Sequence, residues 1–209
     1  PMSENGKLRG RMVAVNQNKD SYLDLYGTDQ KAFYGIMEAD LTDTTMLTFG
    51  LHYQKHEADS PLWGALPLTY SDGSATNYDV SKTTSTNWAY WDTKEERSFV
   101  ELSQKLANNW KVKTSLTHIA STQDSKLFYM YGKPDKTTGV GLYAYPSVYV
   151  YDGQQNLIDV NASGPFRLGG REHQLAVGAN ISHANIVERS DYSSAIGLSV
   201  GDFSQWDGS

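Results

Sequence analysis

The sequence predicts an all-β protein: an antiparallel meander of about seven strands that forms part of a transmembrane β-barrel, with long loops at one end. Three observations lead to this fold class. Apolar and polar residues alternate with a period of two in several segments, the composition is polar yet rich in aromatic residues, and the connections between segments are alternately short and long. The first observation indicates strands, and the other two favour a barrel in a membrane over a soluble sheet.

The alternation is clearest in residues 46–55, where Leu47, Phe49, Leu51 and Tyr53 are each followed by a polar or small residue. Side chains of a strand point alternately to its two faces, so this pattern gives one apolar and one polar face. Six further segments repeat it more or less strictly: residues 8–19, 31–41, 97–106, 110–120, 156–166 and 174–182. Together they predict a meander in which each strand pairs with its neighbour in sequence.

In a barrel of this kind the apolar face of each strand meets lipid and the polar face lines the lumen. The residues expected on the outer side are Leu47, Phe49, Leu51, Val112, Leu116, Leu175, Val177 and Ile181. Those expected on the lumen side are Glu38, Asp40, His52, Lys111, Lys113, Gln174 and Asn180. Glu38 and Asp40 are therefore interpreted as lumen residues, since a glycosidase pair would need a partner across a cleft.

The lengths of strands and connections also indicate a barrel. The expected strands have roughly ten or more residues, whereas soluble strands typically have about 5–6 and a tilted transmembrane strand needs about 9–11. Short connections are expected at 42–45, 107–109 and 166–171, and long ones at 21–30, 59–94 and 125–155. Short turns at one end and long loops at the other are typical of outer-membrane barrels. Seven strands would leave two unpaired edges, which a membrane barrel cannot tolerate, so the chain is expected to be a fragment.

The composition limits the classes of protein to consider. Hydrophobic residues make up 39% of the chain, which is low for a soluble core, but 14 Tyr and 5 Trp argue against disorder. The absence of Cys excludes disulfides and thiolate metal sites, and no run of 18 apolar residues could form a transmembrane helix. A net charge of -6 without a basic cluster argues against nucleic-acid binding, and residues 1–10 lack the apolar stretch of a signal peptide.

Several short motifs resemble those of one family of receptors. They are Ser163-Gly164-Pro165-Phe166 followed by Leu168, Gly170-Arg171, His173 and Leu175; Tyr34-Gly35-Ile36 with Glu38-Ala39-Asp40-Leu41-Thr42; Trp63-Gly64-Ala65-Leu66-Pro67-Leu68; Trp88-Ala89-Tyr90-Trp91-Asp92-Thr93; and Arg9-Gly10-Arg11. In the expected order, from about residue 7 to residue 191, the chain resembles TonB-dependent ferric-siderophore receptors of the hydroxamate and pyoverdine type.

The resemblance implies a barrel of 22 antiparallel strands in the bacterial outer membrane, filled by an N-terminal plug domain. Such a receptor is not an enzyme; it takes up a ferric siderophore with energy from TonB, ExbB and ExbD. Residues 1–209 would then be part of the barrel, without the plug, the TonB-contacting segment or the remaining strands. The expected partners are the ferric siderophore, outer-membrane lipid and, for the full-length protein, TonB–ExbB–ExbD. No cofactor is expected, because the iron arrives already chelated.

Two other functions remain open on the sequence alone. One is a soluble carbohydrate-binding β-sandwich, in which surface Trp and Tyr stack on sugar rings and a second sheet covers the apolar face of the first. The other is a passive outer-membrane porin. A sandwich predicts shorter strands and a chain that closes its own fold, whereas a porin predicts a gene without a plug.

The candidate ligand-binding residues are aromatic. A ferric chelate has flat apolar edges, and Trp and Tyr can cover these edges with a large apolar area and also provide one polar group. Those in or beside the long loops are expected to contact the ferric siderophore: Trp63, Trp88, Tyr90, Trp91, Tyr129 and Tyr131. Tyr53 and Trp110 share the phase of the apolar stripes and are expected in the aromatic girdles. No metal site is expected, since His52 and His56 are too far apart along one face and lack a carboxylate triad.

Overall fold

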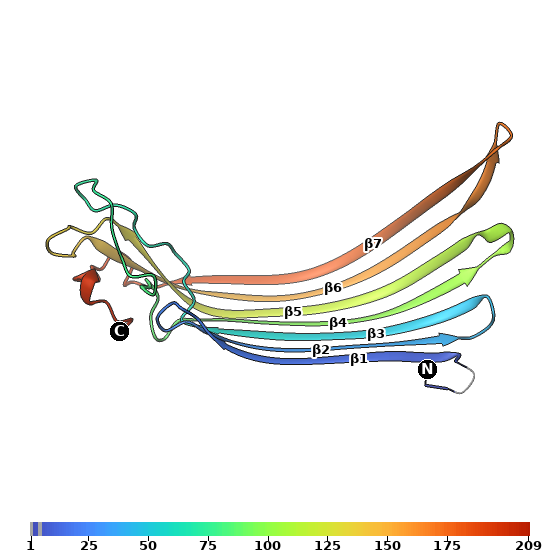
Figure 1. The fold of residues 1–209 in the computed structure, drawn as a ribbon, viewed down its shortest axis with the longest axis horizontal. Coiled ribbons are helices and arrows are strands. Elements are labelled where there is room, and N and C mark those ends of the chain that lie inside the picture. The colour runs from blue at the N-terminus through green and yellow to red at the C-terminus, as the bar shows by residue number, and fades with distance from the viewer. Residues whose placement is uncertain (1, 4–5) are drawn as a thin grey trace.

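The computed structural model describes residues 2–3 and 6–209, and within this part of the chain seven strands form one long antiparallel sheet (Figure 1). The strands are β1 (Leu8–Asp20), β2 (Gly27–Asp40), β3 (Thr45–Asp59), β4 (Tyr90–Lys105), β5 (Lys111–Gly132), β6 (Leu142–Leu168) and β7 (Arg171–Tyr192). Two single 3-10 turns, η1 (Ala107–Asn109) and η2 (Phe203–Gln205), complete the secondary structure of the described residues. Each strand pairs with its sequence neighbours, which confirms the predicted meander.

The described residues contain one sheet, and none of them forms the second sheet that a β-sandwich would place over its apolar face. The strands have 13 to 27 residues, longer than a bilayer crossing requires and far longer than soluble strands usually are. No helix in the part of the chain that the structure describes is long and apolar enough to span a membrane.

The strand register confirms the predicted division into two faces. Cross-strand partners point to the same face, so a row of partners can be followed across the sheet. One row on the outer face consists of Phe49, Val100, Leu116, Ile158 and Ile181. A neighbouring row on the inner face consists of Glu38, Thr48, Glu101, Ser115, Asp159 and Asn180. The same register places every residue that was predicted to face outward on the outer face, and every residue that was predicted to face the lumen on the inner face.

The outer face exposes large apolar side chains in a continuous belt. Ile181 is 69% exposed, Leu116 54% and Phe49 38%. Soluble monomers rarely expose contiguous apolar patches larger than a few hundred Å². A belt that runs across the sheet is therefore a lipid-facing surface, and the alternation in sequence arises because one face meets lipid and the other meets water.

The two ends of the sheet differ as expected (Figure 1). Residues 41–44, 106–110 and 169–170 form the short turns, at the end where the N-terminus lies. Residues 21–26, 60–89 and 133–141 form the connections at the other end, where the C-terminal segment 193–209 also lies. The expected loop 125–155 is wrong, because most of it is strand in β5 and β6. The expected loops 21–30 and 59–94 are likewise shorter than predicted.

The missed strand residues lie where β5 and β6 extend beyond β4. The last cross-strand pair of β4 and β5 joins Tyr90 to Lys126, whereas β5 and β6 stay paired up to Gly132 and Leu142. This extension is covered on its outer face by a small apolar core of Phe128, Met130, Leu142, Ala144 and Phe203, packed against Leu66, Tyr78, Trp88, Val200 and Trp206. Because apolar side chains cover this part of the sheet, the polar–apolar alternation disappears there.

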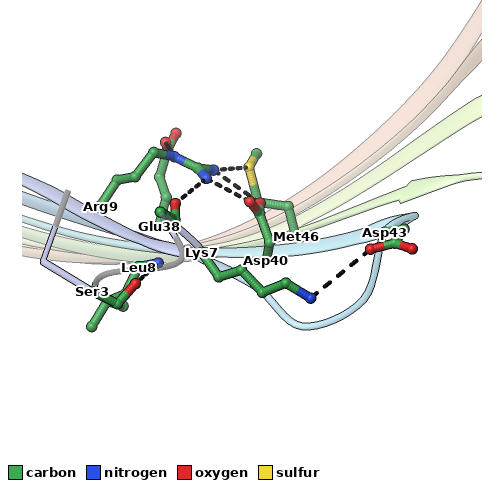
Figure 2. A network of polar contacts seen from close by, with 9 residues as sticks. Ser3, Lys7, Leu8, Arg9, Glu38, Asp40, Asp43 and Met46 are labelled. Carbon is green, nitrogen blue, oxygen red and sulfur yellow. Dashed lines mark hydrogen bonds and ion pairs between the residues drawn. The ribbon is translucent and has the colours of Figure 1, made fainter.

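A network of polar contacts lies near the short-turn end of the sheet (Figure 2). The Arg9 guanidinium donates to both Asp40 carboxylate oxygens, at 2.5 and 2.9 Å, and to Glu38 at 3.3 Å. Lys7 Nζ lies 3.9 Å from the Asp43 carboxylate in the adjacent turn. Both carboxylates that could have formed a catalytic pair are thus ion-paired with one arginine between neighbouring strands, as expected for residues of a polar lumen.

Candidate ligand-binding site at the loop end

The inner face of the β5–β6 extension carries a cluster of tyrosine rings. Tyr129 lies opposite Tyr145 and Tyr131 lies opposite Tyr143, with ring centroids 6.3 and 5.8 Å apart. Tyr192, at the end of β7, packs edge-on against Tyr145 at 6.0 Å. These residues occupy alternate positions of their strands, so they point to the side of the sheet opposite the apolar core. We call them, with Tyr149, the tyrosine cluster.

Trp63 joins the tyrosine cluster from the loop 60–89. Its ring lies 6.2 Å from that of Tyr129 and 5.4 Å from that of Tyr149, edge to face in both pairs. The next residue, Gly64, allows this approach, because a Cβ at that position would lie 2.4 Å from the Tyr129 ring. The loop therefore starts on the inner face, and its first residues press an indole ring against the cluster.

A cavity of about 360 Å³ opens beside Trp63. Its aromatic walls are Trp63, Trp91, Tyr149 and Tyr151, and its polar groups include Gln123, Glu188 and Ser190. A site of this size that combines aromatic and aliphatic walls with a few polar groups is typical of small-molecule pockets.

The structure places four of the six predicted residues on the inner face. Trp63 and Trp91 line the cavity, and Tyr129 and Tyr131 belong to the tyrosine cluster above it. Trp91 is brought there by β4, where it is the cross-strand partner of Ser125 in β5. Residues that are separated in sequence by an entire loop thus form one surface.

The other two predicted residues, Trp88 and Tyr90, lie on the outer face and away from the cavity. Trp88 packs edge-on against Phe128 at 5.7 Å, with the Lys126 ammonium 4.6 Å from its ring. The Tyr90 hydroxyl donates to Asp124 at 3.1 Å. Tyr90 and Trp91 are adjacent in a strand and must point to opposite faces, so the motif that contains both could contribute one of them to the cavity.

Four tyrosines of this site were not predicted, because they lie within the segment expected to be a loop: Tyr143, Tyr145, Tyr149 and Tyr151. A signal was present, because these tyrosines are spaced two or four residues apart in 143–151, which is the period of a strand. Tyr192 gave no such signal. Its place depends on the register of β6 and β7, which pairs it with Ser147.

Comparisons with known proteins agree with this architecture. No family profile matches the chain. A ferric-pyoverdine BN7/BN8 receptor of Pseudomonas putida is 34% identical over 216 residues, a match that covers 100% of this chain and 26% of the relative. This chain also superposes on the crystal structure of the ferripyoverdine receptor of the outer membrane of Pseudomonas aeruginosa, bound to ferripyoverdine. The TM-score is 0.89 at 31% identity, and the superposition covers 100% of this chain and 28% of the receptor chain. A complex of the receptor FpvAI with pyocin S2 gives a TM-score of 0.91 at 31% identity, over 100% of this chain and 27% of the receptor.

The chain thus spans about a quarter of the length of the relatives it matches. The match extends over the whole chain and so includes the segments that form the long strands and the loops at one end. The chain is therefore a homologue of the ferric-pyoverdine receptors, and its sheet corresponds to part of the outer-membrane ferripyoverdine receptor of Pseudomonas aeruginosa.

Proposed function

We propose that the protein containing this segment is an outer-membrane receptor that binds a ferric siderophore and transports it inward with energy from TonB, ExbB and ExbD. The observation that carries the proposal is the aromatic cavity formed by Trp63, Trp91 and Tyr149 on the inner face, at the loop end of the sheet. The relatives named for ferric pyoverdine support the choice of ligand.

The chemistry of the cavity suits a chelate. A ferric siderophore presents flat apolar edges around an iron whose coordination is already complete, so it needs aromatic surface and hydrogen-bonding groups but no protein ligand to the metal. Trp63, Trp91 and Tyr149 supply the surface, and Gln123 and Glu188 supply polar groups. We propose that Tyr129 and Tyr131 extend this surface toward the loops, while Trp88 and Tyr90 support the fold and do not contact ligand.

We further propose that residues 1–209 are one part of a 22-stranded barrel whose other strands pair with the free edges of β1 and β7, and that a plug domain fills the lumen. Two features support this. Backbone groups at a sheet edge have to be paired within the hydrocarbon layer. The inner face also carries ion pairs such as Lys113 with Glu101, at 2.6 Å, which fit a polar interior.

Iron uptake by cells tests the function. A strain that lacks the intact gene should accumulate less iron-55 from ferric pyoverdine under iron limitation, and the plasmid-borne gene should restore it. Uptake should saturate and should stop when TonB is deleted or the proton gradient is collapsed. Uptake that continues without TonB would instead indicate a passive porin and would contradict the proposal.

The adjacent residues Tyr90 and Trp91 test the two faces of the site. Tyr90→Ala in the intact receptor should leave the Kd for ferric pyoverdine within about twofold of wild type, because Tyr90 bonds to Asp124 on the outer face and does not line the cavity. Trp91→Ala should raise the Kd, because its ring lines the cavity. Equal losses of affinity in the two variants, measured by fluorescence titration, would show that the face assignment is wrong.

A further inference from the structure

A C-terminal segment, residues 203–208, is docked on the outer face of the β5–β6 extension. Trp206 stacks on Phe128, with ring centroids 5.7 Å apart and an angle of 9° between the planes. Phe203 is buried and packs edge-on against Tyr78 of the loop 60–89 at 5.4 Å. The segment thus lies between β5 and the loop whose first residues carry Trp63.

Hydrogen bonds connect Trp206 to the start of that loop. The Trp206 indole Nε1–H donates to the Ser85 carbonyl oxygen at 2.9 Å. The Ser85 hydroxyl in turn donates to the Pro61 carbonyl oxygen, also at 2.9 Å. Ser85 is 0% exposed, so both bonds are shielded from water. Pro61 stands two residues before Trp63, and a continuous chain of contacts therefore runs from the outer core to an indole ring of the cavity.

Two further hydrogen bonds fix the same segment to the other end of the loop. The Asn87 amide donates to the Gly208 carbonyl oxygen at 2.9 Å, and the Lys82 ammonium donates to the Trp206 carbonyl oxygen at 2.9 Å. Gly208 has a φ of +87°, and a Cβ at this position would lie 2.3 Å from Leu25 Cδ1 and 3.3 Å from the Asn87 nitrogen. The segment fits closely and leaves no space for a side chain there.

We propose that Trp206 is a positioning residue that acts through Ser85 and Pro61 to hold Trp63 against Tyr149 on the opposite side of the sheet. The loop 60–89 has 30 residues and no helix or named strand. The backbone bond from Ser60 N–H to the Ala89 carbonyl closes its base, and the Ser85–Pro61 bond, which adjoins Trp206, is the next contact toward Trp63. A site held in place before the ligand arrives binds more tightly, because less conformational freedom is lost on binding. The consequence for affinity rests on the proposed function, whereas the effect on Trp63 does not.

The chain offers a matched pair of variants for the test. Trp206→Phe keeps an aromatic ring on Phe128 and removes the indole N–H. Trp110→Phe is the control, because Trp110 Nε1–H also donates to a backbone carbonyl, that of Pro165, at 3.1 Å. Trp110 lies at the short-turn end of the sheet, distant from Trp63. Both variants lose a hydrogen bond from an indole N–H to a backbone carbonyl. The loss in Trp206→Phe should change the position of the Trp63 ring in the cavity, whereas the loss in Trp110→Phe should not.

The intact receptor, labelled with 5-fluorotryptophan, gives a direct readout by fluorine NMR. The Trp63 resonance is identified as the one absent from Trp63→Phe. In Trp206→Phe this resonance should shift or broaden without ligand, and the Kd for ferric pyoverdine should rise about fivefold, the effect of losing one shielded neutral hydrogen bond. Ser85→Ala, which keeps the Trp206 bond and removes the bond to Pro61, should produce the same two changes. Trp110→Phe should produce neither.

The outcomes separate this inference from the proposed function. If the Trp63 resonance of Trp206→Phe and of Ser85→Ala matches that of Trp110→Phe, Trp206 does not position Trp63 and the inference is overturned. If the resonance changes but wild-type receptor does not bind ferric pyoverdine, the positioning role holds and the substrate assignment fails. If the resonance changes and the affinity falls, both are supported.

Discussion

Replacing Trp63 by alanine should weaken the binding of ferric pyoverdine to the intact receptor by about five- to a hundred-fold. The Trp63 ring forms part of the cavity wall and packs against Tyr129 and Tyr149. A well-buried aromatic contact is worth roughly 1–3 kcal/mol, and each 1.4 kcal/mol changes the Kd about tenfold. Titration of purified receptor, followed by the quenching of its fluorescence, measures the change.

Trp110→Ala provides the comparison for this result. Trp110 covers Gly164 on the outer face at the short-turn end, where a Cβ on the glycine would lie 2.5 Å from the indole ring. Its removal should reduce the yield of folded receptor and leave the Kd unchanged. Iron uptake by Trp63→Ala should fall less than affinity does, since the plug and other loops are also proposed to hold the ligand. If Trp63→Ala binds like wild type, the cavity described here is not the ligand site.

The sequence predicted the sheet well wherever the two faces of a strand meet different surroundings. Leu116 faces outward and Ser115 inward in β5, and Phe49 and Thr48 show the same contrast in β3. The prediction failed in the β5–β6 extension, where Leu127, Phe128, Tyr129, Met130 and Tyr131 follow one another. Apolar or aromatic side chains are packed on both sides there, so strand residues give no alternation of polarity.

The candidate site could be predicted in part. Trp63 and Trp91 were identified because aromatic residues beside long loops are suited to binding a chelate. Trp88 and Tyr90 are also aromatic and also lie beside the loop 60–89 in the sequence, yet their side chains lie on the outer face. Their placement depends on the residue at which β4 begins. The contribution of Tyr149 and Tyr192 depends on contacts between strands, and a single sequence without alignment carries little information about those.

The largest effect on folding is expected for an arginine placed in the middle of the outer belt. Ala162 lies between Val112 and Val177 on neighbouring strands and between Val160 and Gly164 along its own strand, all on the outer face. Ala162→Arg should destabilise the intact barrel by about 2–4 kcal/mol, the cost of a charged side chain on the lipid face at the bilayer midplane. Folding into lipid vesicles, followed by the shift of the folded band in unheated gel samples, measures the loss.

Asn161→Arg is the matched control, because it adds the same charge one residue away. Asn161 points to the inner face, and its amide donates to the Asp159 carboxylate at 3.1 Å. An arginine there can pair with the same carboxylate in a wet lumen, so the folded fraction should stay close to wild type. If the two variants fold equally well, neither face of β6 meets lipid. If Asn161→Arg is the more damaging of the two, the faces have been assigned in reverse, and the cavity with Trp63 would then lie outside the barrel.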